Sequence, residues 1–298
     1  MANPEMLKRF RGCVRYQGAR WWQKPFFNPR RFLANQLRKR GFLSGIPGEI
    51  GAVPTFHLVQ FAIVEGEMVS QQIASYGVYE PDLTEAFLHL IKPGQVVLDI
   101  GMHLGYYATL FAALVEKSGE VHAFEPTSST REIALLNTKR FLQIQVHPLA
   151  VWSSPRTLLL RDYGPKWMGF NSLVRVKLDE EPAPPKEIEV QTTTLDEFRS
   201  SLRRPVALIK IDAESAERDI VRGAKGLLER DQPVISAEVG DRADSKESRL
   251  LVEDLIVLGY TPWEFRSGRF RRHQTRERYA YDNLIFAPAS RDLSELCS

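Results

Sequence analysis

The chain has 298 residues, of which 43% are hydrophobic and 26% charged, so it is long enough for one large globular domain with additions. It has no run of about 18 apolar residues and no apolar signal-peptide core, so neither a membrane-spanning helix nor secretion is expected. The net charge is only +3, but residues 1–40 carry eleven Lys or Arg and one acid, which leaves about −7 on the remainder. Cys13 and Cys297 give no disulfide framework or metal spacing and favour a reducing, cytoplasmic compartment.

Residues 1–45 form a basic and aromatic N-terminal arm. Its aromatic side chains are interspersed with arginines: Phe10, Tyr16, Trp21, Trp22, Phe26, Phe27 and Phe32. One interpretation is a surface, within residues 1–40, that contacts an anionic membrane, a nucleic acid or an acidic partner. The other is a helical arm, interrupted by Pro25 and Pro29, that packs its aromatics on the domain.

Residues 46–76 are expected to form a lead-in β-hairpin, with strands at Phe56–Val64 and Gln71–Tyr76. The main domain is predicted to span residues 77–290. It begins with a helix capped by Asp82 or Thr84 and ended by Pro93-Gly94. The apolar face of this helix consists of Leu83, Phe87, Leu88 and Ile91.

The stretch Gln95–Gly105, QVVLDIGMHLG, predicts a buried strand, a glycine turn and a helix that continues to Lys117. This is the opening of a nucleotide-binding α/β unit. The pattern is D-x-G-x-x-x-G and differs from the dinucleotide fingerprint G-x-G-x-x-G. Asp99 suits a ligand with a cationic amino-acid tail better than a pyrophosphate.

A second acid, Glu125, ends the next predicted strand, Glu120–Phe124, where a ribose-binding carboxylate is expected. Pro126 then turns the chain into a helix at Arg131–Arg140. A third strand at Ile144–His147 leads to an apolar turn at Ala150.

Residues 156–194 resemble an insertion, with strands at Leu158–Leu160 and Ile188–Thr192 and a loop containing PAPP between them. Four strands follow, and the last two are joined without a helical crossover, which indicates an antiparallel edge on a parallel sheet. They are predicted at Val206–Ile211, Pro233–Glu238, Thr261–Phe265 and Asn283–Phe286, and Arg266, Arg269, Arg271 and Arg272 line the final connection.

Four acids, Asp99, Glu125, Asp212 and Glu238, each end an apolar strand. The carboxyl ends of parallel strands meet at one sheet edge, where ligands bind. Clustered carboxylates repel one another, so they should have ligands, cations or raised pKa values. Lys210 and Asp212 lie two apart on one strand face and can pair. Glu214 and Glu217 are expected on one side of the following helix.

Several stretches resemble the FkbM family of S-adenosylmethionine-dependent methyltransferases, over about residues 77–287. They are VVLDIGMHLGYYATLFA, VHAFEP, LLN, TTLDEF and LIKIDAESAERDIVRGAKGLL. The chain departs from the family pattern at Ser215, where the family usually has glycine. The resemblance implies a Rossmann-like class I methyltransferase fold: a mostly parallel seven-stranded sheet with an antiparallel terminal strand, plus the basic N-terminal extension.

The residues and the resemblance together give a predicted site, which we divide by role. The cofactor-binding residues are Glu80, Asp99, Gly101, Gly105, Glu125, Pro126 and Ala150. The substrate-binding residues are Asn171, Ser172 and Glu238. The catalytic residues are Asp212, Glu214, Lys210 and His103; Asp212 and Glu214 are candidates for general base or metal ligand, and His103 is a second candidate base.

The expected reaction is methyl transfer from S-adenosylmethionine to a hydroxyl of a sugar, glycolipid or polyketide-like molecule. Oxygen ligands at the acidic edge would suit Mg²⁺. Nucleic acid is not expected as a substrate, because the basic and aromatic residues cluster outside the predicted cleft. Two alternatives are a non-catalytic binding module recruited by its basic arm and a nicotinamide-dependent oxidoreductase; the absent third glycine argues against the latter.

Overall fold

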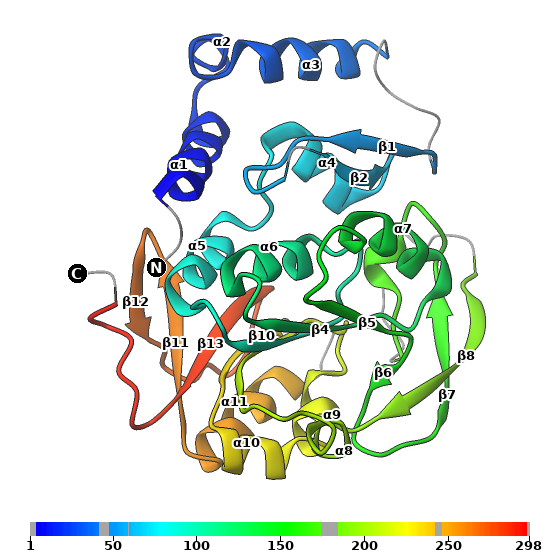
Figure 1. Ribbon diagram of the computed structural model, residues 1–298, viewed down its shortest axis with the longest axis vertical. Coiled ribbons are helices and arrows are strands. Elements are labelled where there is room, and N and C mark those ends of the chain that lie inside the picture. Colours follow the sequence, from blue (N-terminus) through cyan, green and yellow to red (C-terminus); the bar gives the residue numbers. More distant parts are fainter. Residues whose placement is uncertain (1–3, 42–47, 59, 174–183, 242–245, 297–298) are drawn as a thin grey trace.

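The computed structural model describes residues 4–41, 48–58, 60–173, 184–241 and 246–296. Its centre is an eight-stranded sheet in the order β12-β11-β13-β10-β9-β3-β4-β5 (Figure 1). The strands are β3 (Val96–Ile100), β4 (Glu120–Phe124), β5 (Ile144–His147), β9 (Val206–Ile211), β10 (Val234–Val239), β11 (Tyr260–Arg266), β12 (Arg269–Arg272) and β13 (Asp282–Pro288). Five adjacent strands, β10 to β5, are parallel, and β13 pairs antiparallel with β10. The expected Rossmann-like, mostly parallel sheet with an antiparallel edge is confirmed.

The sheet has one more strand than predicted. β12 pairs antiparallel with β11 through a turn at Ser267 and Gly268, both of which adopt positive φ angles. Arg269, Arg271 and Arg272 were expected in a connection between the last two strands. Instead they form an exposed edge strand, which is where charged residues protect a sheet from further pairing.

Helices cover both faces of the sheet (Figure 1). One face carries α5 (Pro81–Leu90), α6 (Tyr106–Val115) and α7 (Ser128–Thr138), and the other carries α8 (Leu195–Arg199), α9 (Glu217–Arg222), α10 (Lys225–Asp231) and α11 (Glu247–Val257). Alternate strand residues enter the two cores: Val97 packs with the α6 side, whereas Val96 and Leu98 pack with the α9 side. Burial on both faces explains why these strands are continuous apolar runs.

The lead-in segment differs from the prediction. The hairpin forms between β1 (Ile50–Val53) and β2 (Phe61–Val64), and the expected strand at Gln71–Tyr76 is instead part of helix α4 (Met68–Tyr76). The Glu67 side chain accepts hydrogen bonds from the backbone N–H groups of Val69 and Ser70, at 2.8 and 2.6 Å. Gly77 ends the helix at φ +74°. These two end signals outweigh the alternating pattern of the short segment.

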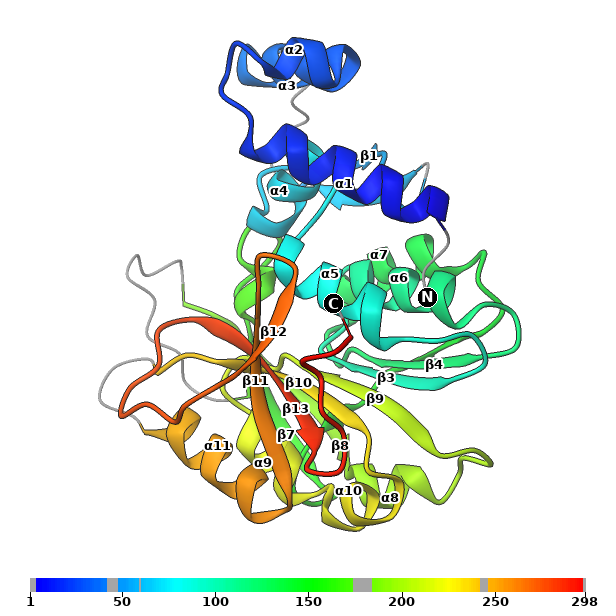
Figure 2. The ribbon, with the colours of Figure 1, turned by 90° about the vertical axis from the view of Figure 1, so that its left-hand side faces the viewer.

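The N-terminal arm contains α1 (Pro4–Gly18), α2 (Lys24–Phe27) and α3 (Pro29–Lys39). Figure 2 shows α1 crossing the β1–α4 unit and the α2–α3 pair beyond it. Phe10 and Tyr16 of α1 are buried, and the Phe10 ring meets Phe56 edge-on. By contrast, Trp21 and Phe26 are exposed. None of the helices in the described ranges is long and apolar enough to cross a membrane.

The segment predicted as an insertion, residues 156–194, supplies two strands of a separate three-stranded sheet, in the order β6-β8-β7. The segment contains β7 (Thr157–Asp162), the short helix η1 (Met168–Phe170) and β8 (Lys186–Thr193), and β6 (Ala150–Val151) precedes it in the chain. The first half of the PAPP run and Cys297 lie outside the described residues.

Candidate active site

A cavity of about 300 Å³ lies at the carboxyl ends of β3, β4 and β9. Its walls come from the glycine loop after β3, the turn after β4, the loop after β9, the insertion and α4. Apolar side chains form most of the wall, including Phe124, Leu149, Val151, Leu160 and Met168. An apolar cavity at this sheet edge, with a few convergent polar groups, is typical of a small-molecule site.

Gly101 fixes the floor of the cavity. Its φ is +74°, and a Cβ atom there would lie 1.8 Å from the backbone oxygen of Asp212. The N–H groups of Gly101 and Met102 both donate to the Phe124 carbonyl, at 3.1 and 3.0 Å. Only a glycine therefore allows the ends of β3 and β9 to approach this closely. Gly105, at φ +83°, begins α6 and lies outside the cavity lining.

Glu125 lies on the cavity wall, with both carboxylate oxygens oriented by backbone groups. Oε2 accepts from the His103 N–H at 3.1 Å, and Oε1 accepts from the Thr127 N–H at 3.0 Å. Burial raises the pKa of Glu125 to about 7, although these hydrogen bonds oppose the shift. Pro126 and Ala150 line the same side of the cavity.

Lys210 is buried between two carboxylates. Its Nζ lies 3.0 Å from Asp212 Oδ2 and 3.7 Å from Asp99 Oδ1, and it also lies 5.1 Å from the centre of the Tyr107 ring. Burial alone would lower the pKa of Lys210, but Asp212, Asp99 and Glu80 raise it well above its usual range. Lys210 therefore stays an ammonium ion at neutral pH. Asp99 is fully buried behind the cavity wall, and burial raises its pKa to about 6.

Three carboxyl groups meet beside Lys210. Oxygen atoms of Asp212, Glu214 and Glu238 lie within 4.8 Å of one another. Burial, together with the charges of Asp212 and Glu214, raises the pKa of Glu238 well above its usual range. Burial also opposes ionisation of Asp212, but Lys210 outweighs it and lowers the Asp212 pKa. The three oxygens could hold a divalent cation that prefers oxygen ligands.

The loop after β9 differs from its prediction. Helix α9 begins only at Glu217, so Glu214 and Glu217 do not share a helix face. Glu214 and Ser215 have φ angles of +51° and +77°, which non-glycine residues rarely adopt. Glu217 is buried and turns back to accept from the Ala213 N–H at 2.9 Å. The departure from glycine at position 215 is thus accommodated in a left-handed backbone conformation.

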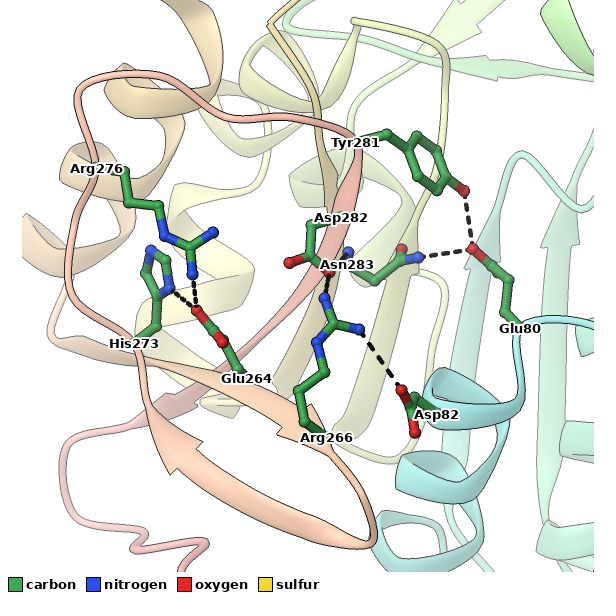
Figure 3. A network of polar contacts seen from close by, with 9 residues as sticks. All are labelled: Glu80, Asp82, Glu264, Arg266, His273, Arg276, Tyr281, Asp282 and Asn283. Atoms are coloured by element: carbon green, nitrogen blue, oxygen red, sulfur yellow. Dashed lines mark hydrogen bonds and ion pairs between the residues drawn. The ribbon is translucent and has the colours of Figure 1, made fainter. Parts of the chain in front are cut away.

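Glu80 sits at the N-terminus of α5 in a network that reaches β13 (Figure 3). Its carboxylate accepts from the Tyr107 and Tyr281 hydroxyls, both at 2.8 Å, and from Asn283 Nδ2 at 2.7 Å. Burial and the charge of Asp212 raise its pKa. Glu80 lies behind the cavity, where it holds two tyrosines, and Tyr107 and Tyr281 both line the cavity.

The predicted cap of α5 is wrong. The Glu80 backbone occupies the N-cap position at φ +40°, and neither Asp82 nor Thr84 caps the helix. Thr84 Oγ1 instead donates to the Tyr79 carbonyl at 2.7 Å. Arg266 bridges Asp82 to Asp282 across the sheet edge (Figure 3).

The insertion closes one side of the cavity. Asn171 lines it, while Ser172 is buried and donates from Oγ to the Glu214 carbonyl at 2.6 Å. His103 also lines the cavity, with a φ of +50°, and burial lowers its pKa below the usual value, so it is neutral at pH 7. No described side chain or backbone group forms a hydrogen bond with its buried Nε2 atom.

The structure brings nine of the predicted site residues to the cavity lining: Gly101, His103, Glu125, Pro126, Ala150, Asn171, Lys210, Asp212 and Glu214. Five others lie behind or beside it: Glu80, Asp99, Gly105, Ser172 and Glu238. Tyr107, Thr127 and Tyr281 also line the cavity and were not predicted. Tyr107 could have been predicted, because it follows the glycine loop at the start of the helix. The sequence around Tyr281 has no feature that indicates a site.

Comparison with known proteins gives the following matches. Residues 99–264, more than half of the chain, match the family model of the methyltransferase FkbM domain. No curated protein sequence matches the chain.

Solved structures give more distant matches. Methyltransferase FkbM from Methylobacillus flagellatus KT is 14% identical, with a TM-score of 0.42 over 68% of this chain and 50% of that one. This chain thus spans half of that protein. An O-methyltransferase from Bacillus cereus is 15% identical, with a TM-score of 0.43 over 70% and 81%. A SAM-dependent O-methyltransferase from Thermotoga maritima is 15% identical, with a TM-score of 0.40 over 85% and 82%. These similarities are too distant to assign a reaction or a substrate to this chain.

Proposed function

The chain belongs to the methyltransferase FkbM family, and from that premise we propose that it transfers a methyl group from S-adenosylmethionine to a hydroxyl oxygen. The proposed acceptor is a sugar, a glycolipid or a polyketide-like small molecule. The observation that carries the proposal is the charge balance at the cavity. Asp99 and Asp212 lie within 4 Å of one buried ammonium group, Lys210, and Glu80 also acts on its charge. Glu214 and Glu238 lie close to Asp212, so five carboxyl groups share this one cation.

This surplus of acids favours a cationic ligand. Burial raises the pKa values of Asp99, Glu80 and Glu238, which disfavours their charged forms, and a cation bound beside them would lower these pKa values and be attracted in return. S-adenosylmethionine carries a sulfonium and an ammonium group, and its activated methyl group leaves behind a neutral thioether. Glu125 offers an oriented carboxylate for a ribose diol, and the wall at Leu149 and Val151 offers an apolar surface for a base.

A hydroxyl group is a poor nucleophile near neutral pH, so its proton must be accepted as the oxygen attacks. Asp212 is ionised and lines the cavity, and Lys210 orients its Oδ2 atom. We assign proton acceptance to Asp212, with Glu214 as the neighbouring carboxylate. Lys210 itself cannot act as a base, because its pKa is raised. His103 is neutral and is the alternative acceptor.

The first experiment is calorimetric titration with S-adenosylmethionine, with and without Mg²⁺. We expect micromolar binding by the intact chain. Glu125→Ala should weaken it about 10- to 100-fold, because a hydrogen-bonded charged acceptor is lost. Glu229→Ala, an exposed residue on α10, is the control and should bind normally. Unaltered binding by Glu125→Ala would contradict the cofactor assignment. Equal affinity with and without Mg²⁺ would show that binding of the methyl donor does not require the metal.

Turnover needs a second experiment, in which transfer of a labelled methyl group to hydroxylated sugars and glycolipids is measured. Asp212→Asn should keep donor binding within a few-fold and lower turnover about 100-fold or more. His103→Asn distinguishes the alternative base. If Asp212→Asn turns over normally and His103→Asn does not, the proton acceptor is His103.

A further inference from the structure

The α2–α3 pair and the turn that precedes it expose large apolar side chains. Trp21, Trp22, Phe26 and Leu33 are 76%, 50%, 82% and 60% exposed, all within thirteen residues of sequence. Figure 2 shows this pair at the far end of the molecule from α10. Apolar side chains gathered in this way on a surface mark an interaction site more often than scattered ones do.

The same surface is uniformly basic. No Asp or Glu occurs between Glu5 and Glu49, a stretch that contains eleven Lys or Arg. Arg30, Lys39 and Arg40 are exposed on or next to α3. With Trp21, Trp22, Phe26 and Leu33 they make a mixed apolar and cationic surface, which we call the arm surface. Trp21 and Lys39 also line the cavity described below.

The inner side of α3 is already engaged by the domain. The Arg31 guanidinium donates to the Pro54 carbonyl at 2.9 Å and to the Ile73 and Ala74 carbonyls at 3.5 Å. Asn35 Nδ2 donates to the Ser75 carbonyl at 2.9 Å. These contacts fix α3 on α4 through Arg31 and Asn35, and the side chains of the arm surface stay exposed beside them.

A second cavity, of about 490 Å³, lies between the arm and α4. Its wall includes aromatic rings and cations, among them Trp21, Phe32, Lys24 and Lys39. The Lys24 Nζ lies 5.3 Å from the ring centres of both Tyr16 and Tyr76. Cations beside aromatic rings, next to exposed tryptophans, match the boundary between lipid headgroups and acyl chains.

We propose that the arm surface binds the surface of an anionic phospholipid bilayer. The exposed aromatics enter the interface while the basic side chains contact the phosphates. A nucleic acid would also complement the positive charge, but its binding would not explain why the apolar side chains of Phe26 and Leu33 are both exposed. Binding would also place the active site close to lipid, because α4 forms part of both cavities: Met68 and Ile73 line the first, and Ser70 and Ala74 the second.

The test is co-sedimentation of the full chain with vesicles. One set contains about one third phosphatidylglycerol in phosphatidylcholine, and the other contains phosphatidylcholine alone. We expect binding to the first set at least about tenfold stronger, and weaker as salt is raised, because each basic residue contributes favourably at an anionic surface. Two triple variants separate the contributions, W21S/W22S/F26S for the apolar part and R30E/K39E/R40E for the charge.

Each triple variant has a matched control. L142S/V257S removes side chains that are also strongly exposed but lie elsewhere, and R203E/K225E/R230E reverses three exposed cations near α8 and α10. We expect each arm variant to lose about tenfold or more in vesicle affinity and each control to bind as the wild type does. Thermal unfolding checks that all four fold.

Three results would overturn the proposal: equal binding to both vesicle types, vesicle binding that both arm variants retain, or salt-sensitive binding to RNA with none to vesicles. The last would assign the surface to nucleic acid. None of these measurements uses methyl transfer, so the proposed function can fail while membrane binding stands, and the reverse.

Discussion

Replacing Gly101 by alanine tests how the site floor is built. The new Cβ would lie 1.8 Å from the Asp212 backbone oxygen, and the residue would keep a φ of +74°. The left-handed backbone costs alanine about 1–2 kcal/mol. The steric overlap adds about 1–3 kcal/mol, because it is relieved only by moving the backbone of β3 or β9 apart. We expect a loss of about 2–5 kcal/mol in the free energy of unfolding.

Gly105→Ala is the matched control, because it shares the backbone strain without the clash. Its φ is +83°, but the nearest atom to a new Cβ is the flexible Met102 Cε at 3.2 Å. It should cost only about 1–2 kcal/mol. Urea unfolding followed by circular dichroism measures both, and a donor titration tests whether Gly101→Ala also displaces Asp212. Equal destabilisation by the two variants, with equal donor affinity, would refute the view that Gly101 sets the approach of the two loops.

Three further outcomes are expected. Burial raises the pKa of Glu125 to about 7, so its carboxyl group is protonated below that pH and ionised above it. Donor affinity, measured by calorimetry, should therefore rise between pH 6 and 8, and Glu125→Gln should abolish the rise. Lys210→Met leaves the buried Asp99 and the partly buried Asp212 without a cation and should cost about 3–5 kcal/mol in urea unfolding, against less than about 0.5 for Lys225→Met. Arg199→Met breaks a buried ion pair with Asp231 away from the cavity, so it should cost about as much stability without altering donor affinity.

Features encoded by local sequence were predictable. Strands such as Glu120–Phe124 and Val206–Ile211 were located to the residue, because burial on both faces makes them largely apolar segments between clear turn signals. Gln71–Tyr76 was mistaken for a strand, since a segment of six residues does not separate the two periods and its end signals lie outside it. The eighth strand was missed because the basic residues of Arg269–Arg272 mark an exposed edge, which has no apolar signature.

The candidate site also contains residues whose positions could be predicted and contacts that could not. Positions at strand ends, such as Asp212 and Glu125, follow from the rule that parallel strands end at one edge. Their surroundings depend on distant chain segments. Glu80 takes hydrogen bonds from Tyr281 and Asn283, about 200 residues away, because β13 inserts antiparallel beside β10. No spacing in the sequence reveals that contact, nor that Asp99 would lie behind the wall.

The three-stranded sheet β6-β8-β7 is hydrogen-bonded within itself and stands apart from the order of the central sheet. It nevertheless supplies Leu160 to the cavity wall, and Ser172, bridged to Arg161 of β7, holds the Glu214 loop. Apart from Ala150 and Val151 of β6, the residues that would hold the methyl donor belong to the central sheet and its loops, whereas the smaller sheet and its connections shape the rest of the wall. The smaller sheet can be lengthened, shortened or exchanged while the central sheet keeps its strand register, so differences among relatives should be concentrated in the smaller sheet. Chimaeras that exchange residues 156–194 should therefore alter acceptor selectivity.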